Sequence, residues 1–198
     1  SSDLAARARG AQVQVPAKVL QIECQERAAT VHYQMAQQAR QCQCRVVVNA
    51  AGPWANEVLR RVSPPPVQVG IDLVQGTHIL VPGSLTQGLS YLEAPKDRRA
   101  VFVMPWRGHT LVGTTETLYR GNPSDVRPLP DEIDYLWQTL AHYFPRYRAG
   151  ERHILDAFAG LRVLPAQGAA PFARSRETIL HPDRREQPRI ITIYGGKL

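Results

Sequence analysis

The chain has 198 residues, 43% of them hydrophobic, and a formal net charge of +7 that is carried mostly by arginine. This length allows one good hydrophobic core, or one core and part of a second. No apolar run is long enough to span a bilayer, and the start of the chain lacks the apolar segment of a secretory signal. The basic residues are scattered and no aromatic ladder accompanies them, so the composition argues against a nucleic-acid-binding protein.

Cysteine usage indicates the compartment. The three cysteines, Cys24, Cys42 and Cys44, are odd in number, and two of them are separated by a single residue. That spacing suits neither a disulfide framework nor a zinc site without further ligands, and the histidines show no metal-binding spacing. We therefore expect a reducing compartment and no metal site.

The first third of the chain is expected to be mostly β-structure. Residues 1–10 have the pattern of a short helix stopped by a glycine, and residues 13–23 and 30–35 are rich in β-forming residues that predict a hairpin. Residues 36–41 predict a polar link. The β-branched run 46–48 shows no polar alternation, which is typical of a strand buried on both faces at the centre of a parallel sheet.

Small residues follow this strand at once. Ala51 and Gly52 remove side-chain bulk where the strand ends, and such ends are where α/β sheets hold ligands. A second apolar run, residues 190–194, stops in the same way at Gly195 and Gly196. An ordinary strand-to-helix turn would explain the small residues at the end of either strand taken alone. That both strands end in this way favours two strands of one sheet whose ends are approached by a large ligand.

The residues between these stretches predict an antiparallel sheet and one helix. Along residues 67–73 apolar and polar side chains alternate, which is the pattern of a half-buried strand. Short runs broken by glycine, proline and charged residues predict further strands at residues 78–81, 89–92, 101–104, 110–113, 154–158, 177–180 and 189–194. Residues 131–144 carry an apolar stripe and an acidic first turn, as an amphipathic helix does. The predicted class is α+β, with an antiparallel sheet and packed helix inserted into a second sheet present only in pieces.

Three cations and one histidine are the candidate functional side chains. Arg162 follows a predicted strand, Arg176 precedes another, and Lys197 follows the paired glycines, so each can be aimed from a strand end into a cleft. Arginine grips an anionic oxygen group through a rigid fork, and lysine adds a compact charge. A solvated surface position is the alternative for any one of them. His78 can act as a base or hydrogen-bond donor near neutral pH, although most lone histidines in strands are structural.

Several motifs, in one order along nearly the whole chain, resemble the FAD-dependent glycerol-3-phosphate dehydrogenases. They are residues 47–54 (VVNAAGPW), 75–79 (QGTHI), 101–106 (VFVMPW), 112–115 (VGTT), 159–162 (AGLR), 175–177 (SRE) and 194–197 (YGGK). This family lies within the D-amino-acid-oxidase-like flavoenzymes, which have an FAD domain and a substrate domain built on an antiparallel sheet. The resemblance therefore agrees with the architecture that the pattern predicts.

The resemblance also divides the chain. Residues 1–53 would be a partial FAD-binding domain with a β-meander and a glycine-ended strand, residues 54–187 the substrate-binding domain, and residues 188–198 a return strand to the FAD-binding domain. No Gly-x-Gly-x-x-Gly occurs, so the adenine-binding strand–turn–helix unit is missing. We therefore expect an internal piece of a longer enzyme, inactive on its own.

Individual roles follow from the same resemblance. Arg176 and Lys197 would hold the phosphate of the substrate and Arg162 its C2 oxygen. The second catalytic candidate, His78, rests on its own position and chemistry and not on the resemblance. Backbone amides of the paired glycines would point at the pyrimidine end of the flavin, where negative charge grows on reduction. The expected cofactor-binding residues are Ala51, Gly52, Gly195, Gly196 and Lys197.

The implied activity is oxidation of sn-glycerol 3-phosphate to dihydroxyacetone phosphate, with FAD as cofactor and a membrane quinone as electron acceptor. The implied location is the cytoplasm, or the inner face of the cell membrane through peripheral association, and a homodimer is compatible with it. Two alternatives stay open. One is an amino- or hydroxy-acid oxidoreductase of the same flavoenzyme group, in which a single arginine clamps a carboxylate. The other is a non-catalytic basic module that binds acidic lipid or nucleic acid in a salt-sensitive way.

Overall fold

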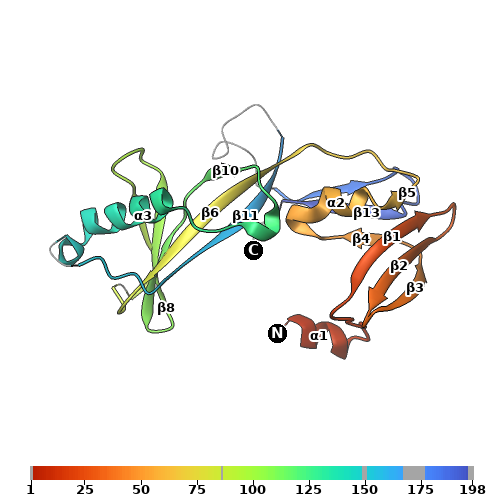
Figure 1. Cartoon of the computed structure of the whole chain (residues 1–198), viewed down its shortest axis with the longest axis horizontal. Helices are drawn as coiled ribbons and strands as arrows, with labels where there is room; N and C mark the ends of the chain where they lie inside the picture. The colour runs from red at the N-terminus through yellow and green to blue at the C-terminus, as the bar shows by residue number, and fades with distance from the viewer. Residues whose placement is uncertain (1, 86, 149–150, 167–176, 196–198) are drawn as a thin grey trace. The chain divides into compact units, whose positions relative to one another are not determined.

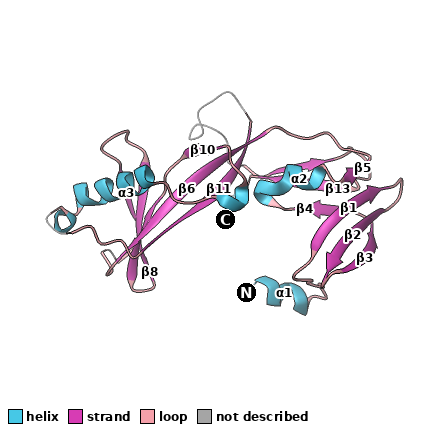
Figure 2. Ribbon diagram, in the orientation of Figure 1, coloured by secondary structure: helices cyan, strands magenta, loops and turns pink. Residues whose placement is uncertain are grey.

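A computed structural model of the chain describes residues 2–85, 87–148, 151–166 and 177–195 (Figure 1). The chain divides into two compact units. The first unit comprises Ser1–Val69 and Glu177–Leu198, and the second comprises Gly70–Arg176. Both units are built mainly of strands, with few helices (Figure 2). The predicted α+β class is confirmed.

The first unit contains two sheets and short helices. Its elements are α1 (Ser2–Ala8), β1 (Lys18–Cys24), β2 (Ala29–Met35), β3 (Gln38–Cys44), β4 (Val47–Asn49), η1 (Gly52–Trp54), α2 (Ala55–Leu59), β5 (Val62–Ser63), β12 (Ile179–Pro182) and β13 (Ile190–Tyr194). One sheet has the order β3-β2-β1-β5 and the other the order β12-β13-β4. The hairpin predicted near the start of the chain is confirmed as β1 and β2, which pair antiparallel.

The polar link predicted at residues 36–41 is wrong, because most of it belongs to β3. Ala36 and Gln37 have positive φ values of 47° and 65° and reverse the chain in a tight turn. The next seven residues then pair antiparallel with β2. A polar segment can form this strand because β3 lies at the sheet edge and nearly all its side chains are exposed, so it needs no apolar face.

The strand at β4 differs in part from the prediction. Its parallel pairing with β13 is confirmed, since residues 47–49 pair with residues 190–192. Its burial on both faces is not, because Val48 is 59% exposed. Val47 and Asn49 share one face of β4 and are half-buried and buried, whereas Val48 lies on the other face, which is open.

The second unit is one antiparallel sheet with a helix packed on it. Its elements are β6 (Ile71–Val81), β7 (Ser90–Glu93), β8 (Ala100–Trp106), β9 (His109–Gly113), β10 (Thr117–Tyr119), η2 (Pro123–Asp125), α3 (Pro130–Tyr143), η3 (Pro145–Tyr147) and β11 (Asp156–Pro165). The strand order is β10-β6-β9-β8-β7, and β11 pairs with β6 over ten residue pairs. Figure 1 shows these two long strands side by side.

Two strands run further than the sequence pattern predicts. Residues 71–73 of the first predicted run and the whole of the run 78–81 belong to one strand, β6, which continues through Gly76 because the backbone of β11 pairs with it there. His78 therefore lies inside a strand instead of at its head. For the same reason Arg162 lies within β11 and does not follow a strand end.

The helix α3, predicted at residues 131–144, is confirmed and covers one face of this sheet. Leu136 and Leu140 pack with a buried cluster of strand residues, which are Ile79, Val81, Val101, Val103 and Val112. The strand residues that alternate with this cluster point to the opposite face of the sheet, because successive side chains of a strand point to opposite faces. Phe158 is 47% exposed there, so the sheet has one covered and one open face.

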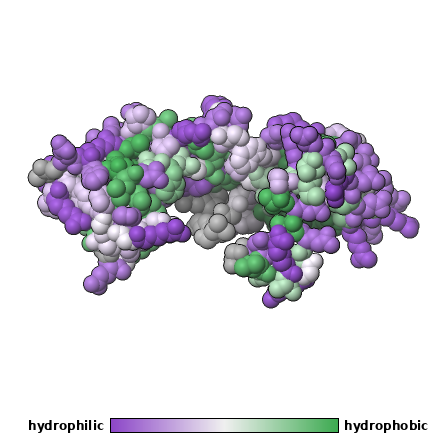
Figure 3. Space-filling model, turned by 60° about the horizontal axis from the view of Figure 1, so that its bottom comes forward, coloured by the Kyte–Doolittle hydropathy of each residue, from purple (hydrophilic) through white to green (hydrophobic). Residues whose placement is uncertain are grey.

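The surface mixes polar and apolar residues. Figure 3 shows hydrophobic residues in separate patches among hydrophilic ones on the face that it presents. No helix in the described ranges is long and apolar enough to cross a membrane.

Candidate active site

Two glycines face each other across the long strands of the second unit. Gly76 of β6 pairs with Gly160 of β11. A side-chain carbon at Gly160 would have no other atom within 4 Å. At Gly76 it would lie 2.5 Å from the Thr114 hydroxyl and 3.4 Å from a guanidinium nitrogen of Arg162. We call this pair the glycine floor: bare backbone, open above Gly160 and bordered by polar groups at Gly76.

His78 lies two residues beyond Gly76, on the same face of β6. Its ring occupies the space above Gly113 of β9. A side-chain carbon at Gly113 would lie 2.1 Å from the nearest ring atom of His78. Phe158 of β11 stacks on its other side, with ring centroids 5.3 Å apart and planes at 9°. Burial lowers the pKa of His78, and the positive charge of Arg162 lowers this pKa further. The imidazole is therefore neutral at neutral pH and able to accept a proton.

Arg162 stands two residues beyond Gly160 and is anchored on one side. Its Nη1 donates to Glu116 Oε1 at 2.7 Å, and its Nη2 donates to the Thr115 carbonyl oxygen at 2.9 Å. The arginine side chain is 30% exposed, and that of Glu116 is 10% exposed. These contacts use two of the five N–H donors that a guanidinium carries. A fork held in this way can donate to an anionic oxygen of a ligand.

A cavity of about 490 Å³ opens beside Arg162. This volume is within the range of small-molecule sites, roughly 300–1,000 Å³. Its walls combine cations, carboxylates, a hydroxyl and an aromatic ring, which suits a small polar anion. The lining residues are Asp97, Arg98, Arg99, Ala100, Phe102, Thr114, Glu116 and Arg162.

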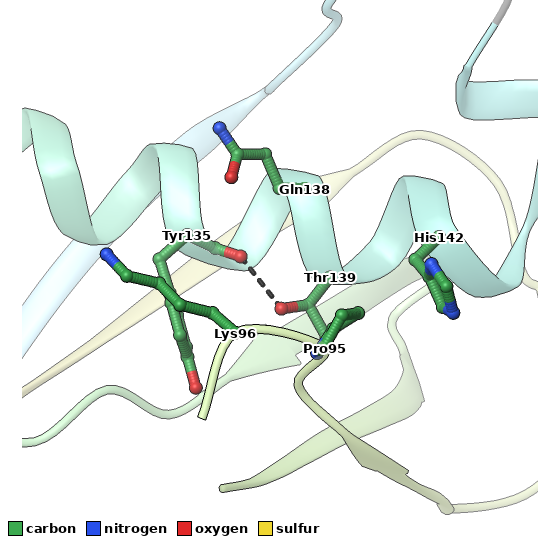
Figure 4. Close-up of a pocket in the computed structure, with 6 residues that line it drawn as sticks. All are labelled: Pro95, Lys96, Tyr135, Gln138, Thr139 and His142. Carbon is green, nitrogen blue, oxygen red and sulfur yellow. Dashed lines mark hydrogen bonds between the residues drawn. The ribbon is translucent and has the colours of Figure 1, made fainter. Parts of the chain in front are cut away.

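A second hollow, of about 360 Å³, lies between α3 and the loop that connects β7 to β8 (Figure 4). It is lined by Pro95, Lys96, Tyr135, Gln138, Thr139 and His142. The only hydrogen bond drawn there joins the Thr139 hydroxyl to the Tyr135 carbonyl one turn earlier in the helix. The drawn polar groups do not converge on a common point, so this hollow is a weaker candidate than the cavity beside Arg162.

In the first unit, the two glycine-ended strands stop at one sheet edge. Asn49 at the end of β4 pairs with Thr192 of β13, and the two strands are parallel. Gly52 has φ +54° and Gly195 has φ +73°, conformations that L side chains rarely adopt. A side-chain carbon at Gly52 would meet no other atom within 4 Å. The edge therefore presents open backbone.

The side chain of Asn49 fixes the backbone that follows β4 through two hydrogen bonds. Its side-chain amide donates to the Ala55 carbonyl at 2.9 Å, and its side-chain oxygen accepts from the Ala51 amide at 3.3 Å. The turn after β4 is thereby fixed, with Ala51 and Gly52 next to the end of β13. Small residues on a fixed turn allow a large planar cofactor such as a flavin to approach the backbone. Ala51 and Gly52 are among the residues that the sequence analysis expects to bind the cofactor.

The structure describes only part of the expected site. It places Arg162 and His78 around the glycine floor, and Ala51, Gly52 and Gly195 at the second sheet edge. Three expected residues lie outside the described residues, so their positions stay predictions. They are Arg176, Gly196 and Lys197.

Sequence reasoning missed four residues that build the site. Gly113 and Phe158 enclose His78, Glu116 holds Arg162, and Glu132 lies buried behind the floor. Glu132 is visible in the sequence only as one acid of a helix first turn, which the helix dipole explains equally well. Only alternation along the paired strands could have placed Phe158 and His78 on one face. Among the described residues, no group of three His, Cys, Asp or Glu side chains could hold a metal ion.

Comparison with known proteins gives the family. The sequence matches the FAD dependent oxidoreductase family over residues 4–196. It is 32% identical over 163 residues to the D-erythritol 1-phosphate dehydrogenase of Brucella abortus, which covers 81% of this chain and 32% of that protein. It is 33% identical over 160 residues to the aerobic glycerol-3-phosphate dehydrogenase of Escherichia coli, which covers 79% of this chain and 32% of that protein.

A solved structure agrees with this result. The glycerol-3-phosphate dehydrogenase from Bacillus halodurans, complexed with FAD, matches with a TM-score of 0.78 and 25% identity, over 98% of this chain and 37% of that one. The chain spans about a third of the length of the curated relatives that it matches. On the family match and these relatives, the chain belongs to the FAD-dependent oxidoreductases.

Proposed function

We propose that the chain is part of a flavoenzyme that oxidises sn-glycerol 3-phosphate to dihydroxyacetone phosphate. The observation that carries the proposal is the pair Arg162 and His78 on either side of the glycine floor, next to a cavity rich in cations. Relatives whose names specify phosphorylated polyols support the same substrate class.

The division of labour follows the two units. The first unit would carry FAD against Ala51, Gly52, Gly195, Gly196 and Lys197, and the second would carry the substrate. The second unit lies in the chain between the two stretches of the first, which supports a substrate domain inserted into an FAD-binding domain, with expected bounds at residues 54–187. When bound, FAD supplies the acceptor for the hydride of the alcohol carbon.

The side chains of the second unit have distinct tasks in this proposal. Arg162 donates hydrogen bonds to the C2 oxygen, which gains negative charge as its proton leaves. His78, neutral because burial and Arg162 lower its pKa, accepts that proton at an imidazole nitrogen. The electron pair of the C–H bond leaves as hydride, so the alcohol becomes a ketone. Arg176 and Lys197 are proposed to hold the phosphate.

A four-carbon polyol phosphate is the second candidate substrate. The relative from Brucella abortus is named for D-erythritol 1-phosphate, and a cavity of about 490 Å³ leaves room for a chain longer than glycerol phosphate. Both candidates share the reaction and the site residues, so they differ only in the length of chain that the cavity accepts.

Steady-state kinetics of the full-length enzyme separate the candidates. We expect turnover with glycerol 3-phosphate or D-erythritol 1-phosphate, and none with amino acids or 2-hydroxy acids. Turnover of carboxylates alone would replace the proposal by the amino- or hydroxy-acid alternative. Salt-sensitive binding to anionic vesicles or DNA without any turnover would favour the non-catalytic basic module.

We also propose a quinone as the electron acceptor, with peripheral association at the cytoplasmic face of the membrane and a homodimeric assembly. The resemblance to the glycerol-3-phosphate dehydrogenases supports these three expectations. Turnover with soluble quinone analogues, sedimentation with vesicles, and light scattering test them separately. A strict requirement for dioxygen as acceptor would contradict the quinone.

A further inference from the structure

Glu132, at the third position of α3, is a buried carboxylate with an unusual number of donors. It is 5% exposed, and both of its oxygens accept hydrogen bonds. Its side-chain donors are Gln75 Nε2 at 2.6 Å, Thr77 Oγ1 at 2.5 Å, Thr115 Oγ1 at 2.8 Å and Thr117 Oγ1 at 2.8 Å. A buried carboxylate that accepts from four side chains fixes each of them in one orientation.

Two of these donors flank the glycine floor. Gln75 and Thr77 stand on either side of Gly76 in β6. Because side chains alternate along a strand, they point toward α3 while Gly76 faces the opposite side, where Arg162 lies. Glu132 therefore fixes the two residues that flank Gly76, from the face of the sheet that α3 covers.

The Oε1 atom of Glu132 is connected to Arg162 through a single intervening residue, Thr115. The Thr115 hydroxyl donates to Glu132 and accepts from the Thr77 backbone amide at 2.9 Å. The Thr115 carbonyl accepts from Nη2 of Arg162, and the next residue, Glu116, accepts from Nη1. The segment 115–116 is thus bonded to Glu132 through the Thr115 hydroxyl. It is bonded to Arg162 through the Thr115 carbonyl and the Glu116 carboxylate.

The charge of Glu132 is retained in the fold. Burial raises the pKa of Glu132, but hydrogen bonds from Thr77, Thr117, Thr115 and Gln75 lower it, and the net pKa lies below the ordinary glutamate value. A buried charge is a poor device for stability, since apolar residues of similar volume often serve as well. Its connection to Arg162 through Thr115 indicates a different use.

We propose that Glu132 is a positioning residue, which fixes Thr115 and thereby aims the guanidinium of Arg162 over the glycine floor. This inference rests on the proposed function in so far as Arg162 binds the substrate. Glu132 does not line the cavity beside Arg162, and no described hydrogen bond joins the two residues, so it acts on the guanidinium through the 115–116 segment.

Two threonines provide a matched test. Thr115 and Thr117 each donate one hydroxyl to the same oxygen of Glu132 at 2.8 Å, but only Thr115 continues to Arg162. We would therefore compare Thr115→Val with Thr117→Val, and Glu132→Gln with the exposed first-turn variant Asp131→Asn. The threonine pair keeps the test valid even if Glu132→Gln does not fold.

The first readout is the pKa of His78, measured by NMR titration of the imidazole signals and assigned with His78→Gln. Arg162 lowers this pKa, so displacement of the guanidinium raises it. We expect Arg162→Met, Thr115→Val and Glu132→Gln to raise it, and Thr117→Val and Asp131→Asn to leave it unchanged. An unchanged value in Thr115→Val, or in Arg162→Met, would overturn the proposal.

The second readout is a double-mutant cycle on kcat/KM in the full-length enzyme. Thr115→Val should lower kcat/KM by roughly tenfold to a hundredfold, as small misplacements of catalytic groups do. In an Arg162→Lys background most of that loss should vanish, because the two substitutions damage the same contact. Fully additive losses would reject a positioning role. The His78 titration needs no turnover, so it judges the positioning role even if glycerol 3-phosphate is not the substrate.

Discussion

Gly76 and Gly113 of the second unit and Gly52 of the first require glycine for different reasons. At Gly76 and Gly113 no positive φ calls for glycine, but neighbouring side chains occupy the place of a side-chain carbon. At Gly52 the surroundings are empty, and it is the left-handed φ of +54° that favours glycine. One unit packs polar groups closely around a small space, whereas the other leaves a bare edge. This difference is consistent with the proposed division, in which the second unit binds a small anionic substrate and the first binds a large planar cofactor.

The largest expected effect is on turnover. Arg162→Lys removes the fork that donates to the developing oxyanion while keeping the charge, so kcat/KM should fall by roughly 10²–10³-fold. Steady-state kinetics of the full-length enzyme measure this loss. Arg152→Lys is the control, because Arg152 is an exposed arginine of the same unit that pairs with Asp134. Equal kcat/KM in the two variants would mean that Arg162 does not contact the substrate.

The next effect separates crowded from open glycines. Gly113→Ala places a methyl group against the His78 ring, and such overpacking costs roughly 1–3 kcal/mol in the free energy of unfolding. Gly160→Ala adds the same group where no atom lies within 4 Å, so it should leave folding stability nearly unchanged and raise KM instead. Denaturant titrations compare the two. A larger loss of stability in Gly160→Ala would show that the space above the floor is not open.

A smaller effect tests the first unit. Gly52→Ala forces a side chain into a left-handed conformation and should cost about 1 kcal/mol of folding stability. Gly52→Asn should cost less, because asparagine tolerates that conformation. Both add bulk at the sheet edge, so both should weaken FAD binding, which fluorescence titration measures. Normal FAD affinity in both variants would remove Gly52 from the cofactor site.

The smallest effect is on acid stability. The pKa of Glu132 in the folded protein lies below its unfolded value of about 4.3. A carboxyl shifted in this direction stabilises the fold above the unfolded pKa, and this contribution is lost as pH falls through the folded pKa. Wild-type protein should therefore lose stability more steeply below about pH 4.3 than Glu132→Gln does. Parallel pH profiles of the unfolding midpoint would show that Glu132 is not held as a carboxylate.

Local patterns predicted the elements that depend on burial or on glycine. The apolar stripe of α3 and the two strands that end at glycine, β4 and β13, were visible because each pattern lies in a short run of neighbouring residues, and the likeness of the two strands indicated that they share a sheet. β3 was not, because an exposed edge strand needs no apolar alternation and its turn uses Ala36 and Gln37, which are not turn-typical residues. The single long strand β6 was split in the prediction, since the pairing that carries it through Gly76 comes from β11.

The site was predictable only at the level of single residues. Arg162 and His78 carry recognisable chemistry, so sequence reasoning found them. Their supports lie on other strands: Gly113 and Phe158 reach His78 from β9 and β11, and Glu132 reaches the floor from α3. Which residues meet across a sheet is set by register, and register requires the fold.

A crystal structure of the full-length protein with FAD and glycerol 3-phosphate tests the central claim most directly. The account predicts the C2 oxygen above the glycine floor, within hydrogen-bond distance of both Arg162 and His78. A substrate bound with Arg162 still engaged only by Thr115 and Glu116, and with its alcohol carbon distant from Gly160, would contradict it.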